Sequence, residues 1–408
     1  MDKNEPNPLL EKLKHLGVFS GAKGMVIPPH SKKPIEVVLG GELVETPYGA
    51  VLSIEKQFQD DYHHGKVLLD DIPISPIVMD WSKPTKNLPM SPKVVFLDTE
   101  TSGLAGGTGT FAFMIGCGCM TQDGFKSTQL FMSEPGLEPA LLCVLDKILY
   151  GADVIVTFNG KSFDMPVIRN RYVLHHMEPS FIDCHHIDIL HLSRRIWRER
   201  LKSRRLGELE REILEFNRSG EDIPGWMVPE MYLDFLTSRD PAPLAGVFYH
   251  NRMDILSLGA LLKHLSILID NDNENVNQHG SDSLAIARLY GDQGLDMEAA
   301  NRYEQLIGTN LQEHQQEIVY TQLANIYRKK GMLDKSIALL ELATQYGSVN
   351  AAISLAKIYE HIQRNYQMAL FWTEEAMKYS EIDGHSEDIR PSIDHRLQRI
   401  KHKIAKME

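Results

Sequence analysis

Cysteine is scarce in this chain, which has four among its 408 residues. A fold held together by several disulfide bridges is therefore excluded. Cys117 and Cys119 lie within an apolar run that is typical of a strand rather than a loop. We expect the cysteines to be reduced core residues.

The sequence also lacks an apolar run of the roughly 20 residues that a helix needs to cross a bilayer. Its first residues, MDKNEPNPLLEKLKHLG, do not have the basic-then-apolar order of a secretion signal. We therefore expect a cytoplasmic protein with no membrane partner.

Positive charge is in deficit, since 43 Lys and Arg stand against 55 Asp and Glu for a formal net charge of -12. A broad electrostatic grip on nucleic acid is excluded, because phosphate binding depends on Lys and Arg that displace counterions. Any nucleic-acid site must be local. The one dense cationic run, residues 194–205, contains Glu199 as its only acid. A solvated helix face is the ordinary interpretation of such a run.

The length and the patterning predict three units. A chain of 408 residues exceeds one ordinary core, and 43% hydrophobic with 24% charged residues is typical of a globular protein. Residues 1–90 alternate short apolar stretches with turns, which predicts a small β-rich segment. In residues 91–270, compact apolar runs alternate with helical spacing, which predicts a mixed α/β sheet with flanking helices. A polar stretch at residues 270–278 predicts a linker before residues 281–408.

Residues 281–408 are predicted to be wholly helical and repetitive. The segments IARLY, LANIY and LAKIY begin at Ile286, Leu323 and Leu355, at spacings of 37 and 32 residues. These spacings lie on either side of the period of about 34 residues that tetratricopeptide repeats have. An unrelated helical bundle is the alternative. Such repeats would bind a partner protein or extend the substrate surface.

A pair of acids marks the end of the first apolar run of residues 91–270. Asp98 and Glu100 follow the buried stretch 94–97 and stand two residues apart, so they project from the same face of a strand. Carboxylates pressed together at a core edge resist ionisation unless a cation neutralises them or they share a proton. Mg2+ and Mn2+ prefer such oxygen ligands.

Two further acids follow along the chain. Asp164 comes after an Asn-Gly turn and opens a helix, and a helix N-terminal carboxylate is the alternative interpretation of it. Asp254 lies inside an apolar helix, where an unpartnered acid is costly. His250 precedes Asp254 by four residues, an offset of about 40° on a helix, whereas Tyr249 is offset by about 140°. We therefore expect His250 to lie beside Asp254, although it could also only cap or pack at the helix start.

In their order and spacing these segments resemble the three exonuclease motifs of the DEDD superfamily, which has the ribonuclease H-like fold. The chain is similar in particular to bacterial YprB-type ribonuclease H-like proteins over residues 90–268. The matching segments are residues 98–109, 186–195, 222–225 and 250–251. The resemblance implies a 3′–5′ exonuclease that acts on a single-stranded end of DNA or RNA with two divalent ions, Mg2+ or Mn2+. It implies that these ligands are Asp98, Glu100, Asp164 and Asp254.

Within this interpretation His250 is the residue that orients and deprotonates the attacking water, because an imidazole titrates near neutrality. This chain departs from the superfamily here: the usual patterns are a His five residues or a Tyr four residues before the last Asp, and the two types are exchanged. The cationic run 194–205 then becomes a contact to the substrate backbone. A non-catalytic adaptor that binds nucleic acid, or a partner through its repeats, is the competing hypothesis.

Three other patterns carry less weight. The Gly-rich segment 103–110 lacks the Gly-Lys-Ser/Thr of a nucleotide-binding loop, so a hairpin with a minor substrate contact fits better. Cys184, His185, His186 and His191 lack zinc-ligand spacing, and packing is the preferred interpretation. Asp188 is interpreted as a structural acid that accepts hydrogen bonds.

Overall fold

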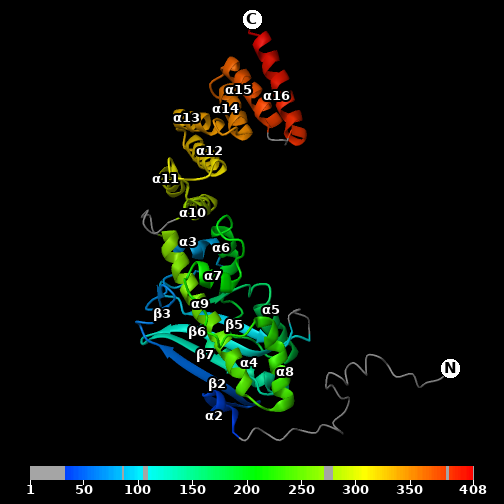
Figure 1. Cartoon of the computed structure of the whole chain (residues 1–408). Helices are drawn as coiled ribbons and strands as arrows, with labels where there is room; N and C mark the ends of the chain where they lie inside the picture. The colour runs from blue at the N-terminus through cyan, green and yellow to red at the C-terminus, as the bar shows by residue number, and fades with distance from the viewer. Residues whose placement is uncertain (1–32, 85–86, 104–108, 271–278, 383–385, 408) are drawn as a thin grey trace, which may run out of the picture.

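The computed structural model describes residues 33–84, 87–103, 109–270, 279–382 and 386–407 (Figure 1). A mixed seven-stranded sheet forms one end of the molecule, and a stack of helices extends from it. The strands in spatial order are β1 Glu42–Thr46, β2 Gly49–Phe58, β7 Gly124–Phe131, β6 Ala112–Thr121, β5 Val94–Thr101, β8 Val154–Thr157 and β9 His185–Asp188. A separate two-stranded ribbon pairs β3 His63–His64 with β4 Val67–Leu68. A mixed sheet with flanking helices is the α/β architecture that the sequence predicts for this part of the chain.

Strands β1 and β2 come from the segment that the sequence analysis set apart as residues 1–90. They extend the main sheet at one edge, because β2 pairs antiparallel with β7 from Leu52 opposite Phe131 to Phe58 opposite Phe125. The boundaries of the three predicted units stay a prediction. The hairpin expected at residues 103–110 lies largely outside the described residues.

Strand β5 has a central place in the sheet. It pairs antiparallel with β6 and parallel with β8, which in turn pairs parallel with β9. Parallel strands place their carboxyl ends at the same edge of a sheet. The last residues of β5, β8 and β9 therefore meet at one edge, and the chain leaves β9 directly into a helix.

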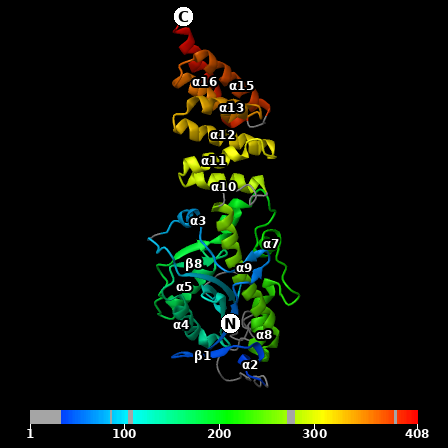
Figure 2. The same cartoon turned by 90° about the vertical axis from the view of Figure 1, so that its left-hand side faces the viewer.

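Helices cover both faces of the sheet (Figures 1 and 2). Phe96 points to the face that α9 covers, whereas its neighbour Leu97 points to the face that α4 covers, as strand alternation requires. The helices around the sheet are α2 Ile35–Leu39, α3 Pro76–Trp81, α4 Glu138–Leu149, α5 Asp164–Leu174, α6 Ile189–Ile196, α7 Leu206–Glu212, α8 Val228–Ser238 and α9 Ala245–Asp270. Short 3-10 turns occupy Pro135–Leu137, Gly225–Met227 and Ala242–Leu244.

Helix α9 crosses β5, β6 and β7 and then continues toward the helical stack (Figure 1). It approaches the sheet closely because β6 carries Gly116, where an added Cβ would overlap the side chains of Asn251 and Ile255. This small residue, which is paired with Asp98 of β5, therefore lets the first half of α9 lie close to the acid-bearing strand.

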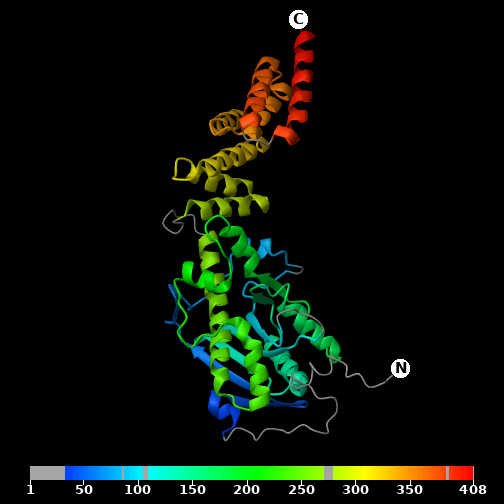
Figure 3. The ribbon, with the colours of Figure 1, turned by 45° about the vertical axis from the view of Figure 1, so that its right-hand side comes forward.

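The C-terminal part is all helical, as predicted, and stacks successive helices away from the sheet (Figure 3). Its helices are α10 Gly280–Asp292, α11 Asp296–Leu306, α12 Glu313–Lys329, α13 Leu333–Thr344, α14 Val349–His361, α15 Tyr366–Ile382 and α16 Ser386–Ala405. Gly294 and Gly331 end two of the turns with positive φ angles of 78° and 77°. The assignment of these helices to tetratricopeptide repeats stays a prediction. In the described part of the chain, no helix is long and apolar enough to cross a membrane.

The stack is attached to the end of α9. The carbonyl of Ile269 accepts hydrogen bonds from Tyr290 Oη at 3.2 Å and from Arg302 Nη2 at 2.9 Å. Leu265 and Ile269 are buried in the same cluster as Leu284 of α10. The helical stack and the sheet unit therefore share one apolar core.

Candidate metal centre

The side chain of Asp98 is fixed by a buried chain of amides. Asp98 Oδ2 accepts a hydrogen bond of 3.0 Å from Nδ2 of Asn251, which is completely buried on α9. The Oδ1 atom of Asn251 accepts a 3.0 Å bond from Nε2 of Gln129, which also donates to the carbonyl of Phe248. Arg252 donates to Oε1 of Gln129 at 2.9 Å. This chain joins α9 to β7 and orients the carboxylate of β5.

Glu100, His250 and Asp254 come together beside Asp98. One ligand atom from each of these three side chains lies within 4.8 Å of the other two. Glu100 is 8% exposed, and within the described residues no side-chain donor binds its carboxylate. Two distant segments, β5 and α9, thus form one acidic group.

The predicted arrangement of His250 and Tyr249 on the helix is confirmed. His250 Nε2 lies 3.6 Å from Asp254 Oδ2, one helical turn away. Tyr249 points elsewhere, because its Oη accepts a 2.9 Å hydrogen bond from the backbone N–H of Ser219. The catalytic role of His250 is not tested by this geometry and stays a prediction.

Asp164 opens α5 and is 5% exposed. Its Oδ1 accepts a short hydrogen bond from the hydroxyl of Thr99, the residue between the two acids of β5. Asp164 lies outside the group of three ligand atoms but close enough for its charge to raise the pKa values of Asp98 and Glu100. Asp164 of α5 therefore lies next to β5, the strand that carries Asp98 and Glu100.

Asp188 holds the turn that leads to Asp164. It is 1% exposed, and its carboxylate accepts hydrogen bonds from the backbone N–H groups of Asn159 at 2.8 Å and Lys161 at 3.1 Å. It also caps α6 by accepting from Leu190 N at 3.1 Å. The interpretation of Asp188 as a structural acid is confirmed.

The buried acids resist ionisation. Burial first, and then the charges of Asp254 and Glu100, raise the pKa of Asp98 well above its usual range. Burial raises the pKa of Glu100 to about 8, although His250 opposes the shift. Burial also raises the pKa of Asp164 to about 6 against the opposing hydrogen bond from Thr99. A divalent cation would offset the cost of ionising these buried, mutually repelling carboxylates. The donor set of carboxylates and one imidazole fits Mg2+ or Mn2+.

Arg218 is a member of the site that sequence reasoning missed. It is mostly buried, and its guanidinium donates to Glu210 Oε1 at 2.6 Å and to Asp254 Oδ1 through a short contact. Although burial opposes the charged form, Asp254 and Glu210 raise the pKa of Arg218 above its ordinary value. Its contacts depend on how α7 and α9 pack together, so no local signal in the sequence points to it.

The Nδ1 atom of His250 has two neighbours that compete for it. Asp222 Oδ1 lies at 2.8 Å and can only accept, whereas Arg218 Nη1 lies at 3.1 Å and can only donate. The shorter contact favours a proton on Nδ1 that is donated to Asp222, which makes the Arg218 contact purely electrostatic. The other ring nitrogen, Nε2, is then left facing Asp254.

The cationic run 194–205 is divided between two surroundings. Arg195 pairs with Asp292, and Arg200 Nη1 donates to Asp282 Oδ2 at 2.8 Å, so both bind α10 rather than a substrate surface. Four other cationic residues of the run line a cavity of about 540 Å³ that also contains Asp98 and Asp254. They are Arg194, Lys202, Arg204 and Arg205. The interpretation of the whole run as a substrate contact is therefore wrong for Arg195 and Arg200 in this structure.

Three acids within or just after this run have partners outside it. Glu210 pairs with Arg218, Glu208 pairs with Arg211, and Glu199 Oε2 accepts a 2.6 Å bond from Gln315 Nε2 of α12. The order of charged residues along the sequence does not predict these partners, because each pairing depends on tertiary contacts.

Three of the four side chains around β9 for which packing was expected have polar partners inside the protein, whereas His191 is exposed. His185 Nε2 lies 2.6 Å from Ser82 Oγ, and His186 Nε2 lies 2.8 Å from Thr157 Oγ1. Cys184 Sγ donates to the carbonyl of Ala152 at 2.9 Å. Among the described residues these side chains form no metal-ligand group.

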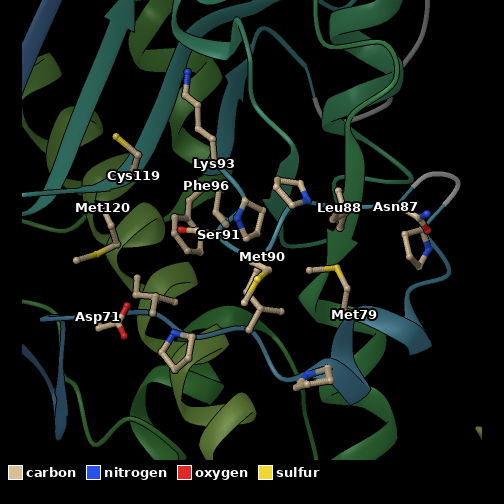
Figure 4. A pocket seen from close by; sticks show the side chains of 18 of the residues that line it. Asp71, Met79, Asn87, Leu88, Met90, Ser91, Lys93, Phe96, Cys119 and Met120 are labelled. Carbon is tan, nitrogen blue, oxygen red and sulfur yellow. The ribbon is translucent and has the colours of Figure 1, made fainter.

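A cavity of about 870 Å³ lies away from the carboxylates, near the start of β5 (Figure 4). Met79, Met90 and Met120 surround it, with Asp71 and Lys93 at its margin. It shares no lining residue with the acidic group and therefore adds nothing to the chemistry at Asp98.

Comparison with known proteins agrees with the geometry. Residues 95–266 match the RNase H superfamily. The uncharacterized protein YprB of Bacillus subtilis (strain 168) is 31% identical over 317 residues, which are 76% of this chain and 75% of that protein. This chain belongs to the YprB family. Its RNase H superfamily domain points to a nuclease-type hydrolase with a nucleic-acid substrate.

One solved structure shows a weaker likeness to this YprB-family chain. The family B DNA polymerase from the archaeon Pyrobaculum calidifontis is 17% identical, with a TM-score of 0.33. The alignment covers 51% of this chain and 30% of the polymerase chain. A likeness at this level supports no statement about substrate or mechanism.

Proposed function

We propose that this chain is a metal-dependent 3′–5′ exonuclease of the DEDD type, which hydrolyses phosphodiester bonds at a single-stranded end of DNA or RNA. The observation that supports it is the meeting of Asp98 and Glu100 of β5 with Asp254 of α9, where burial and mutual repulsion raise carboxyl pKa values. Within the described residues, Asp254 has an ion-pair partner in Arg218 but Asp98 and Glu100 have none, and buried acids are costly to leave without a cation.

The residues that would hold two divalent ions, Mg2+ or Mn2+, are Asp98, Glu100, Asp164 and Asp254. When bound, such ions stabilise the negative charge that develops on the entering and leaving oxygens of a phosphodiester. Asn251 holds Asp98 and Thr99 holds Asp164, so these two carboxylates are oriented before any ion binds.

His250 is assigned to the proton transfer. Asp222 holds Nδ1 in its protonated form, which leaves the lone pair of Nε2 available to accept a proton from the attacking water. Although burial opposes it, the charges of Asp254 and Glu100 raise the pKa of His250 in the absence of cations. Neutralising those two carboxylates removes this cause and returns the imidazole toward the neutral form that a base requires.

The test compares purified full-length protein with Asp98→Asn and Glu100→Gln in Mg2+ and in Mn2+. We expect both substitutions to lower the rate of oligonucleotide hydrolysis by at least about a thousandfold, since several kcal/mol of charge stabilisation is lost. Asp146→Asn is the matched control, because Asp146 also accepts a hydrogen bond but lies on α4 away from the site. Folded variants of Asp98 or Glu100 with undiminished activity would contradict the proposal.

A non-catalytic adaptor is the second candidate, and the Arg218 contact is the observation that favours it. A guanidinium already neutralises Asp254 and could replace a cation there. The two candidates differ in metal binding: a nuclease binds Mn2+ at these acids and releases nucleotides, whereas an adaptor binds nucleic acid without either property.

A further inference from the structure

The loop between α6 and α7 carries basic side chains toward two different parts of the molecule. Trp197 anchors its start: this side chain is completely buried, and its ring stacks on His264 of α9 at a centroid distance of 6.3 Å. The carbonyl of Trp197 accepts a 3.0 Å bond from Leu201 N. Arg204 Nη1 donates to the carbonyls of Leu201 at 2.7 Å and Lys202 at 3.3 Å, so the loop is folded on itself.

One side of the loop is bound to the helical stack. Asp282 of α10 is 2% exposed and accepts the 2.8 Å bond from Arg200, while Asp292 at the other end of α10 pairs with Arg195. Two ion pairs thus bracket the anchor Trp197 on either side. A charged pair with a buried member resists separation, because breaking it leaves an uncompensated charge.

The opposite side of the loop lies at the acidic site. Lys202, Arg204 and Arg205 line the cavity that also contains Asp98 and Asp254. Phe158, which is half-buried, lines the same cavity and offers an aromatic ring beside the cations. Cations that follow a phosphate backbone, combined with an aromatic surface for bases, are the features with which proteins hold single-stranded nucleic acid.

We infer that helix α10 positions this basic loop, residues 197–205, against the acidic site, so that the helical stack determines how tightly the single-stranded substrate binds. The inference rests on the proposed function for the identity of the substrate. It adds that the stack is part of the substrate-binding apparatus and not only a partner-binding appendage. The residues Asp282 and Asp292 are positioning residues, since they act through Arg200 and Arg195.

The experiment uses the full-length double variant Asp282→Asn with Asp292→Asn. Asp296→Asn is the matched control, because Asp296 lies on α11 and pairs with Lys329 at 3.6 Å inside the stack. Removing negative charge by itself strengthens nucleic-acid binding. The double variant is expected to do the opposite, which separates loss of positioning from a change in net charge.

Three quantities are measured on each protein. Hydrogen exchange of the amides in residues 198–205 should accelerate about tenfold or more in the double variant, because the loop loses its attachments. The Kd for a fluorescent 12-nucleotide single strand in Ca2+, followed by anisotropy, should rise about tenfold, and its dependence on salt should become shallower by the equivalent of one or two phosphates. Mn2+-dependent hydrolysis of bis(p-nitrophenyl) phosphate, too small to reach the loop, should stay within about twofold.

Unchanged exchange or an unchanged Kd in the double variant would overturn the inference, as would failure of the wild-type protein to bind the strand. An equal loss of hydrolysis of the small phosphodiester would also overturn it, since that would show general damage to the site. A wild-type protein that binds the strand but hydrolyses neither substrate would contradict the proposed function instead. In that case the exchange and Kd measurements still decide whether α10 positions the loop.

Discussion

Replacing Glu100 by glutamine should make the metal-free protein more stable while it removes activity. Glutamine has the shape of a protonated glutamate but cannot ionise. Glu100 is buried, accepts no side-chain hydrogen bond among the described residues and lies beside Asp254. The substitution therefore removes a repulsion without breaking a described hydrogen bond.

The magnitude follows from the pKa of Glu100, which burial raises from an ordinary value of 4.5 to about 8. The pKa of Glu100 is higher in the folded state than in the unfolded state. Its contribution to folding is therefore most favourable below about pH 4.5, where it is protonated in both states, and is lost as the pH rises toward 8. The resulting penalty at pH 7 is about 3 kcal/mol, and at pH 9 it approaches about 5 kcal/mol. The advantage of Glu100→Gln over the wild type should increase with pH accordingly.

The assay is chemical unfolding of both proteins in EDTA at pH 5, 7 and 9, followed by tryptophan fluorescence. Adding Mn2+ should reverse the order, because the wild-type carboxylate gains a cation that the amide cannot bind as strongly. A glutamine variant that is less stable than the wild type at every pH, or equally stabilised by Mn2+, would refute this reasoning.

Three further outcomes are expected. His250→Ala should slow hydrolysis about a hundredfold and remove the dependence on a group that titrates near neutral pH, whereas Tyr249→Phe should stay within about fivefold, as pH–rate profiles would show. Arg218→Gln should destabilise the metal-free protein by about 3 kcal/mol in urea unfolding, because buried Glu210 and half-buried Asp254 lose their cationic partner, and Mn2+ should restore part of this loss. Asn251→Ala should weaken Mn2+ binding about tenfold in titration calorimetry, since Asp98 loses the amide that orients it.

The parts of the site that could be predicted from the sequence are those with a local signal. Asp98 and Glu100 end an apolar run whose strand character is evident, and the offset of four residues between His250 and Asp254 fixes them on one side of a helix. The buried strands of the sheet and the helical character of the C-terminal part have equally local patterns. Periodicity alone therefore indicated which residues share a face.

The parts that could not be predicted depend on contacts between distant segments. Strands β1 and β2 join the main sheet through pairing with β7, and nothing in residues 42–58 specifies that partner. Arg218 reaches Asp254 across 36 residues, and Gln129 reaches Asn251 across 122. The cationic run shows the same limit, because its charge is evident but its division between α10 and the acidic site is a property of the folded chain.

The most direct test of the nuclease assignment is product analysis with the purified full-length protein, Mn2+ and a single-stranded oligonucleotide labelled at its 5′ end. The account predicts a ladder of labelled products that shorten one nucleotide at a time from the 3′ end, together with free nucleotides. EDTA and Asp98→Asn should each abolish the ladder. An oligonucleotide that stays intact while the protein binds both it and Mn2+ would contradict the account and leave the adaptor as the function of this chain.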